Sequence, residues 1–581
     1  AHDALLRELA HIPDGPLSEI FAAQLAERLR NRDPRTNPAI GWLEERLAAQ
    51  GASVETVVRH AQDRLGASNL SLRNVITAFR TLAATNWNDL FEQVSLVEAR
   101  LRDHPGYGAM DFLSRNLYRS AVEDLARGCD LREQDVADHA VRLSERPDTD
   151  ARHQDPGWYL IDGGHKELEA VIGFRPPLRL SVRRLCALTG LRGYLAVITG
   201  LTLVLMLAGG QQVWAAGAPD ALFWPWMVAM LFPLGAAAIA VIDLMVARSV
   251  GAALLPGLDL KKGVPSVWRT MVVMPVILTD APDLRRQIES LEIPHLSGTS
   301  GDLTFALLTD GADAPQATMP QDAALSDLAT SQIARLNALY PAGPAGPRFL
   351  HLHRARRLNP SEGVWMGWER KRGKLHELNL LLRGDRDTSF VTPDGGVPQV
   401  PADIRFVITL DADTRLPRDA AARLIGKMAH PLNRPVFDDR LGRVTSGYGV
   451  LQPRITPSLA AHHSATIFER VTCGPGGMDP YATASSDVYQ DLFGEGSFAG
   501  KGIYDVDAFQ AAMRGRIGNN RVLSHDLLEG IFARAGLASD IQLIEAFPDR
   551  HDIAARRQHR WTRGDWQLLA WLRDPRTPAL G

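Results

Sequence analysis

Two aspartates directly after an apolar run are the clearest sign of chemistry in this sequence. Phe406–Leu410 reads Phe-Val-Ile-Thr-Leu and is followed by Asp411 and Asp413. Carboxylate oxygens are hard ligands that suit Mg²⁺ or Mn²⁺, and such an ion usually also holds substrate phosphates. The pattern predicts a buried strand that leads into a metal–diphosphate site. The alternative is a helix start that one of the two aspartates caps.

Two further acidic positions have a similar character. The apolar run Thr304–Leu308 leads to Asp310, whose carboxylate could accept hydrogen bonds from a nucleobase or ribose, although Asp-Gly is also an ordinary turn. In Ser-His-Asp-Leu-Leu-Glu, Asp526 and Glu529 share one helical face. A positioned aspartate can take the proton from an attacking sugar hydroxyl, so Asp526 is a candidate general base. Capping of a helix by Ser524 is the alternative.

Basic residues gather in two places. Lys371 and Lys374 stand before or at the start of a helix-like run, where cations and a helix N-terminus could together bind a diphosphate. Arg557, Arg560 and Trp561 combine guanidinium groups with an indole that a sugar ring could stack on. The alternatives are a solvated basic turn and an amphipathic helix lying on a membrane surface.

Composition excludes several classes of protein. The 581 residues are 45% hydrophobic and 23% charged, which is typical of a globular chain. Lys and Arg total 64 against 67 Asp and Glu, a net charge of −3, so we expect no nucleic-acid partner. The three cysteines, Cys129, Cys186 and Cys473, have no Cys-x-x-Cys spacing, which excludes a disulfide scaffold and a structural zinc cluster.

One region predicts a transmembrane hairpin. The stretches Gly193–Pro219 and Ala221–Ile242 carry no charged residue, and each exceeds the ~20 residues that a helix needs to cross a bilayer. Buried helices of a soluble core are the alternative. The intervening turn has no Lys or Arg, whereas both flanks are basic, so we expect both ends in the cytoplasm. The basic flanking residues are Arg183, Arg184, Arg192, Arg248, Lys261 and Lys262.

The hairpin separates two regions of different pattern. Residues 1–180 show apolar residues at helical spacing and predict a helical bundle; residues 181–262 hold the hairpin with its flanks. From residue 263 to residue 581, apolar runs alternate with amphipathic stretches, which predicts an α/β domain with a largely parallel sheet. The expected strands are Met271–Leu278, Thr304–Leu308, Phe406–Leu410 and Val444–Leu451. Ligands of such sheets bind beyond the carboxyl ends of the strands.

The order of these motifs resembles that of processive GT-A glycosyltransferases of the cellulose-synthase type. The matching residues are Asp310, Asp411-x-Asp413, Asp526 and Arg560-Trp561. Three longer strings are similar to cyclic β-1,2-glucan synthases: residues 409–414, 494–505 and 557–561. The resemblance covers most of the chain and is strongest between Met271 and Trp571, and it implies a GT-A fold for the α/β domain.

The resemblance also implies a reaction, an inverting transfer of glucose from UDP-glucose. Asp310 would contact the uridine, Asp411 and Asp413 would hold the diphosphate through Mg²⁺ or Mn²⁺, and Asp526 would be the base. Arg560 and Trp561 would bind diphosphate and acceptor, in addition to the binding that the basic residues Lys374 and Arg557 predict by themselves. Two positions depart from the family pattern. The base motif reads Ser-His-Asp instead of Thr-Glu-Asp, and Arg557 stands where the family has Gln.

Further expectations rest on the resemblance alone. The growing β-glucan would be attached to a tyrosine, with Tyr481 the first candidate and Tyr489 the second. The chain would lie at a bacterial inner membrane with its helical and catalytic domains on the cytoplasmic side, and a full-length member would add a C-terminal phosphorylase domain. Two other classes stay open: a metal-dependent phosphohydrolase or nucleotidyltransferase, and a non-catalytic, membrane-anchored glycan-binding scaffold.

Overall fold

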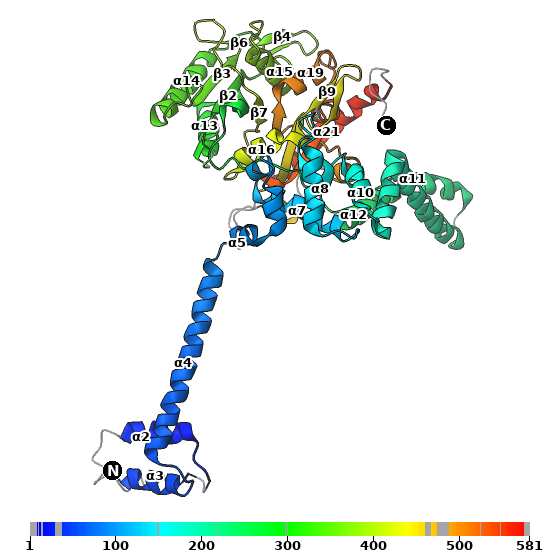
Figure 1. The fold of residues 1–581 in the computed structure, drawn as a ribbon. Helices are drawn as coiled ribbons and strands as arrows, with labels where there is room; N and C mark the ends of the chain where they lie inside the picture. The colour runs from blue at the N-terminus through cyan, green and yellow to red at the C-terminus, as the bar shows by residue number, and fades with distance from the viewer. Residues whose placement is uncertain are drawn as a thin grey trace. The chain divides into compact units, whose positions relative to one another are not determined.

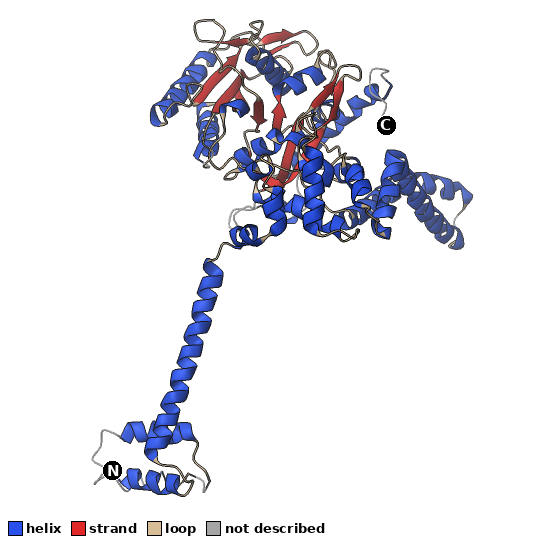
Figure 2. Ribbon diagram, viewed as in Figure 1, coloured by secondary structure: helices blue, strands red, loops and turns tan. Residues whose placement is uncertain are grey.

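A computed structural model gives the fold of the chain in two compact units, Ala1–Ser95 and Leu96–Gly581 (Figure 1). The structure describes residues 9, 11–12, 15–29, 38–147, 150–217, 219–296, 298, 300–458, 466–472, 487–522, 525–546 and 548–573. In the described residues, the elements before Thr270 are helical, and the strands begin with β1 at Thr270 (Figure 2). The unit boundary after Ser95 falls inside the predicted 1–180 bundle, and that domain division stays a prediction.

The first unit contains the helices α2 (Glu19–Leu29), α3 (Pro38–Ala48), α4 (Val54–Ala84) and α5 (Trp87–Val94). Its small apolar core is formed where α2 and α3 meet the start of α4. The helix α4 begins at a capping box, because Ser53 and Thr56 each satisfy a backbone N–H of the other.

The second unit opens with five further helices, which share one apolar core. They are α6 (Leu96–Leu101), α7 (Phe112–Ala126), α8 (Glu133–Ser144), α9 (Pro156–Ile161) and α10 (His165–Ile172). Glu98 is fully buried, accepts a hydrogen bond from the Tyr107 hydroxyl (2.6 Å) and pairs with Arg119. This helical part also bonds to the α/β part, where Gly257 N donates to Ser114 Oγ (2.7 Å).

Two helices follow that are long and apolar enough to cross a membrane. They lie within α11 (Leu178–Ala215) and α12 (Asp220–Ser249), with candidate spans at Thr189–Ala215 and Ala221–Ser249. Only 6% of each span is buried inside the protein, which differs from a pair of soluble core helices. Tyr194 in α11 donates a hydrogen bond to Asp243 Oδ1 in α12 (2.7 Å). The predicted hairpin is therefore present as a helix pair.

A nine-stranded sheet organises the rest of the unit, in the order β6-β3-β2-β1-β7-β12-β11-β13-β8. β1 pairs in parallel with β2 and β7, β2 with β3, and β11 with β13, while β12 runs antiparallel between β7 and β11. The predicted mostly parallel sheet is confirmed. Its strands are β1 (Thr270–Leu278), β2 (Leu303–Gly311), β3 (Phe349–Arg354), β6 (Phe390–Val391), β7 (Phe406–Thr409), β8 (Thr414–Arg415), β11 (Val450–Pro457), β12 (Gly502–Asp505) and β13 (Ala535–Glu545).

Helices cover both faces of this sheet because its strands are apolar on both sides. Along β1, Val272 and Met274 belong to one core cluster, and Met271 and Val273 belong to the other. The first cluster includes residues of α13 (Ala281–Leu296), α14 (Asp322–Leu339) and α16 (Ala420–Ala429). The second includes residues of α15 (Arg370–Leu382), α19 (Val506–Met513) and α20 (Asp526–Ala533). The remaining elements are β4 (Arg357–Asn359), β5 (Val364–Met366), β9 (Val436–Asp438), β10 (Arg443–Ser446), α17 (Ile467–Thr472), α18 (Val488–Phe493), α21 (His551–Gln567), and the 3₁₀ turns η1 (Tyr107–Ala109), η2 (Ser266–Trp268), η3 (Pro431–Asn433) and η4 (Leu568–Arg573).

One expected strand was wrong. Val444–Leu451 is not continuous, because β10 ends at Ser446 and β11 begins at Val450. Gly447 between them has φ 65°, and a Cβ atom there would lie 1.8 Å from the carbonyl oxygen of Arg434. Both the left-handed backbone and this contact require glycine, so the apolar run is interrupted by a turn.

The buried Glu98 predicts a pH-dependent stability of the helical part. Burial raises its pKa, but the bonds from Tyr107, Arg102 and Arg119 outweigh burial and lower the pKa below 4.5. A lowered folded-state pKa stabilises the fold above the unfolded-state pKa, and the gain is lost as pH falls through the folded value. Glu98→Ala should cost about 3 to 5 kcal/mol at pH 7, because it leaves Arg119 buried without its counter-charge.

Hydrogen exchange of the α6 and α7 amides measures this effect. Wild-type protection should fall as pH decreases from 5 towards 3, after correction for intrinsic exchange, and Glu98→Gln should flatten that decrease. Glu123→Gln on the exposed side of α7 serves as the control. Equal protection in Glu98→Ala and wild type would contradict the assignment.

Candidate active site

The strand directions bring acidic and basic residues to one edge of the sheet. Asp310 is the last residue but one of β2, Asp411 follows β7, and Glu545 is the last residue of β13. These three strands run in the same direction, so all three residues lie at the carboxyl edge of the sheet. Because β12 runs antiparallel and pairs Gly502 with Thr409, the residue before it, Lys501, lies at this edge too. From β1 the sheet extends on one side through β2 and β3, and on the other side through β7. The strand order therefore reverses at β1, and open α/β sheets bind ligands at such a switch point.

A cavity of about 920 Å³ opens at this edge. Six of the predicted site residues line it: Asp411, Asp413, Asp526, Arg557, Arg560 and Trp561. Its other lining residues are largely charged: Glu362, Glu369, Arg370, Lys371, Arg372, Lys501, His525, Glu545, Arg556 and Arg563, with Pro275, Ser361, Met366, Ala412, Ala499, Asn520, Val522, Ile553 and Gln567 completing it.

Asp411 lies between two ammonium groups. Lys371 Nζ is 2.6 Å from Oδ1, and Lys501 Nζ is 3.2 Å from Oδ2. Burial alone would raise the pKa of Asp411, but the two lysines outweigh burial and hold the pKa well below its ordinary value. Asp411 is therefore an anion whose two oxygens are both already bound by cations, and its role is to fix Lys371 and Lys501 at the cavity wall.

Asp413 is in a different state. It is exposed to the cavity, and its carboxylate has no ion pair or hydrogen bond with the part of the chain that the structure describes. Desolvation and then the nearby Glu545 raise the pKa of Asp413 above its ordinary value. An unengaged carboxylate beside another carboxylate suits a divalent cation, because the cation would relieve the repulsion. The residues present therefore fit a metal at Asp413 better than at Asp411.

Glu545 is a site residue that the sequence reading missed. It is 1% exposed and pairs with both Lys501 and Arg557. The Arg557 guanidinium in turn stacks over the Trp561 ring at 4.5 Å. Only Gly564 is buried among the residues of α21, and the Arg557–Glu545 ion pair is one attachment of this helix to the sheet. An acidic residue at the end of an apolar run, the signal used for Asp310, was also present here.

Asp526 is the first residue of α20 and lies against Gly500. Gly500 has φ +79°, and a Cβ atom there would lie 2.6 Å from Asp526 Oδ1. This oxygen is buried and has no hydrogen-bond partner among the described residues. His525 Nδ1 lies 3.5 Å from it and 2.8 Å from Glu529 Oε1. The Asp526 side chain thus lines the cavity, and its Oδ1, which lies near His525, accepts no hydrogen bond from the described residues.

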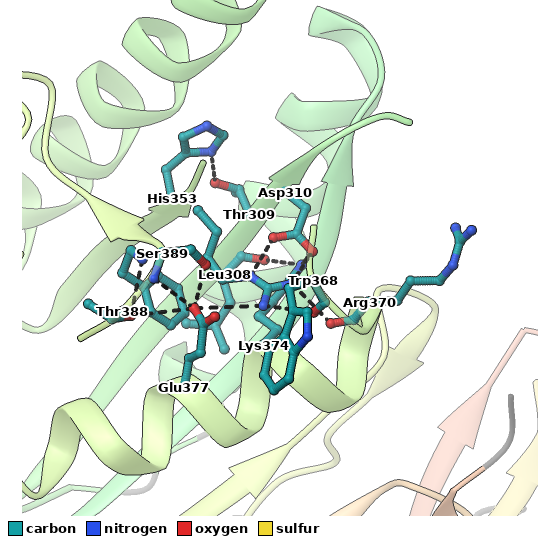
Figure 3. Close-up of polar contacts among 12 residues, drawn as sticks. Leu308, Thr309, Asp310, His353, Trp368, Arg370, Lys374, Glu377, Thr388 and Ser389 are labelled. Carbon is teal, nitrogen blue, oxygen red and sulfur yellow. Dashed lines mark hydrogen bonds and ion pairs between the residues drawn. The ribbon is translucent and has the colours of Figure 1, made fainter. Parts of the chain in front are cut away.

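Asp310 and Lys374 are buried and do not line the cavity, and Figure 3 shows them close to each other. Arg354 binds Asp310 through two bonds, Nε to Oδ1 (2.8 Å) and a terminal nitrogen to Oδ2 (2.9 Å), and Lys374 Nζ lies 3.1 Å from Oδ2. Burial lowers the pKa of Lys374 to about 8, although Asp310 opposes the shift. Neither residue lines the cavity, so their expected contacts with uridine and diphosphate stay predictions.

Of the two tyrosine candidates, the structure describes Tyr489. Tyr481 lies outside the described residues. Tyr489 in α18 packs edge-on against Tyr194 of the helix pair, with ring centroids 6.3 Å apart, and does not line the cavity. The attachment of a glucan to either tyrosine stays a prediction.

Comparison with known proteins gives one similar protein. The chain is 41% identical over 568 residues, 96% of its length, to the cyclic beta-(1,2)-glucan synthase NdvB of Rhizobium meliloti (strain 1021). The resemblance to the cyclic β-1,2-glucan synthases is confirmed. The chain spans 20% of the length of that synthase. No family model matches the chain.

Substitution of Lys501 tests whether the ion pairs at the sheet edge stabilise the fold. Lys501→Met removes the ammonium group that pairs with Glu545 and Asp411, so the buried carboxylate of Glu545 keeps only Arg557. We expect a loss of about 3 kcal/mol in stability. Thermal unfolding monitored by hydrogen exchange of β12 and β13 measures it, and Lys262→Met is the exposed control. A Lys501→Met loss as small as the control loss would contradict the interpretation.

Proposed function

We propose that the chain is an inverting, metal-dependent glycosyltransferase with a GT-A fold, which transfers glucose from UDP-glucose to a growing β-1,2-glucan. The observation that carries the proposal is the convergence of Asp411, Asp413, Asp526, Arg560 and Trp561 on one cavity. Similarity to a cyclic beta-(1,2)-glucan synthase over 96% of the chain supports the reaction class. The mostly parallel sheet, with its site at the carboxyl edge, supports the fold.

The charges around the cavity suit a sugar nucleotide. Lys371, Lys501, Arg556, Arg560 and Arg563 line it and can neutralise a diphosphate. We propose that Asp413 holds Mg²⁺ or Mn²⁺, with Asp411 nearby, and that the ion neutralises charge on the leaving UDP when it is bound. Lys371 and Lys501 are held in place by Asp411, so the cost of ordering these side chains is met before the donor binds.

The transfer itself needs a base and an acceptor site. Asp526 accepts the proton of the acceptor 2-hydroxyl as the oxygen attacks the anomeric carbon of glucose. The bond to UDP breaks on the opposite face with its electron pair leaving on the diphosphate, so α-linked glucose becomes β-linked. Trp561 offers a flat apolar surface for a sugar ring, and Arg557 orients it by stacking on its face.

The remaining parts are proposed to organise synthesis at a membrane. The helix pair α11 and α12 would anchor the catalytic part at the cytoplasmic side of a bacterial inner membrane. The glucan would grow on a tyrosine, Tyr481 or Tyr489. The synthase that the chain resembles is about five times longer than the matched region, which leaves length for a C-terminal phosphorylase domain.

Asp526→Asn tests the proposed base. The purified chain in lipid nanodiscs, incubated with labelled UDP-glucose and Mg²⁺, should incorporate glucose, and Asp526→Asn should lower incorporation by about 10² to 10⁴-fold. Asp507→Asn is the matched control, because Asp507 lies in the first turn of α19 at the opposite edge of the sheet. Near-normal incorporation by Asp526→Asn would remove the base assignment, and phosphate or pyrophosphate release without glycan growth would favour the hydrolase class.

Asp413→Asn tests the metal site separately from chemistry. Calorimetric titration with UDP should show binding to the wild type that weakens strongly when EDTA removes the divalent cation. Asp413→Asn should lose most of this metal dependence while its residual affinity without metal matches that of the wild type. A wild type that binds no UDP with Mg²⁺ or Mn²⁺ would support the non-catalytic scaffold instead.

A further inference from the structure

A turn with a strained backbone connects the buried Asp310–Arg354 pair to the residues that line the cavity. It comprises Gly367–Arg370 and leads directly into α15. Glu369 and Arg370 both have φ 50°, the left-handed region that costs a non-glycine residue about 1 to 2 kcal/mol. Two such residues in succession persist only where the surroundings hold the backbone in place.

The guanidinium group of Arg354 holds this backbone. One of its terminal nitrogens donates to the carbonyl oxygen of Trp368 and the other to that of Arg370, both at 3.1 Å. These two carbonyl groups enclose Glu369, the first left-handed residue. Figure 3 shows Trp368 and Arg370 beside Asp310 at the end of β2. Arg354 is fully buried, so no solvent competes for these bonds.

The orientation of Arg354 is itself fixed from the sheet. Asp310 binds the guanidinium through two parallel bonds, a geometry that only arginine can form. Gly367 is required for this approach, because a Cβ atom there would lie 2.4 Å from Asp310 Oδ2. Arg354, at the end of β3, is therefore oriented by Asp310 near the end of β2, and Arg354 in turn holds the turn.

The residue that the turn delivers to the cavity is Lys371. Its ammonium group lies 2.6 Å from Asp411 Oδ1 and 2.9 Å from the carbonyl oxygen of Gly500. Resting on the proposed function, we propose that Arg354 is a positioning residue for donor binding: it holds the left-handed turn so that Lys371 stands where the diphosphate of UDP-glucose binds. Arg354 does not line the cavity, so its effect on donor binding passes through the turn, and chiefly through Lys371.

A double-mutant cycle tests this dependence. UDP is titrated calorimetrically with MgCl₂ into the wild type, Arg354→Lys, Lys371→Met and the double variant, all in nanodiscs. Arg354→Lys keeps the charge but loses the fork, so UDP affinity should fall about tenfold or more. The double variant should bind no more weakly than Lys371→Met. Losses that add in the double variant would overturn the proposal.

Glycine provides a rescue that a merely structural role would not predict. Since glycine adopts φ 50° without strain, Arg370→Gly in the Arg354→Lys background should restore most of the lost UDP affinity. Arg370→Ala in the same background removes the same side chain but not the strain, and should restore none. Equal affinities of the Gly and Ala variants would contradict the role of the turn.

Two controls separate this inference from folding and from the proposed function. Arg348, which precedes β3 at its other end, donates hydrogen bonds to the carbonyl oxygens of Gly301 and Leu303. Arg348→Lys makes the same chemical change away from the cavity and should leave UDP affinity unchanged. If the wild type binds no UDP, the proposed function fails. Hydrogen exchange of residues 367–373 still measures whether Arg354 stabilises the turn. Faster exchange of residues 367–373 in Arg354→Lys supports its role there, and unchanged exchange overturns it.

Discussion

The pairing of Asp411 with Lys371 and Lys501 is the interaction on which the rest of the site depends. A carboxylate between two ammonium groups keeps all three ionised in a part of the protein where an isolated charge would be costly. From Lys501 the chain of opposite charges continues to Glu545 and Arg557. One connected set of ion pairs therefore joins the side of the cavity next to α15 to the helix α21.

The fold makes this set possible through strand direction. Each acidic residue ends or follows a strand that points to the same sheet edge, and the antiparallel strand β12 brings Lys501 to that edge from the opposite direction. Glycines at Gly367 and Gly500 let carboxylates approach the backbone where any side chain would collide. The site is thus built from strand ends and tight turns of the sheet, and the Arg557–Glu545 ion pair joins α21 to it.

The sequence predicted much of this architecture, and the physical reasons are specific. Apolar runs that end in aspartate located Asp310, Asp411 and Asp413, and two long uncharged stretches located the membrane-type helix pair. Sequence named Lys371 and Lys374 together and could not separate their positions: Lys371 lines the cavity, whereas Lys374 is buried and bonds to the carbonyl oxygen of Val276. Gly447 interrupted an apolar run, and Glu545 was overlooked although its strand end carries the same signal.

A structure of the chain bound to UDP and Mn²⁺ tests the central claim most directly, because the anomalous signal of manganese locates the ion independently of the nucleotide. The account predicts the ion on the carboxylate of Asp413 and the diphosphate within bonding distance of Lys371 or Lys501, with the β-phosphate, to which glucose is attached in the donor, on the side of Asp526. Nucleotide bound elsewhere, or manganese away from both Asp411 and Asp413, would contradict it.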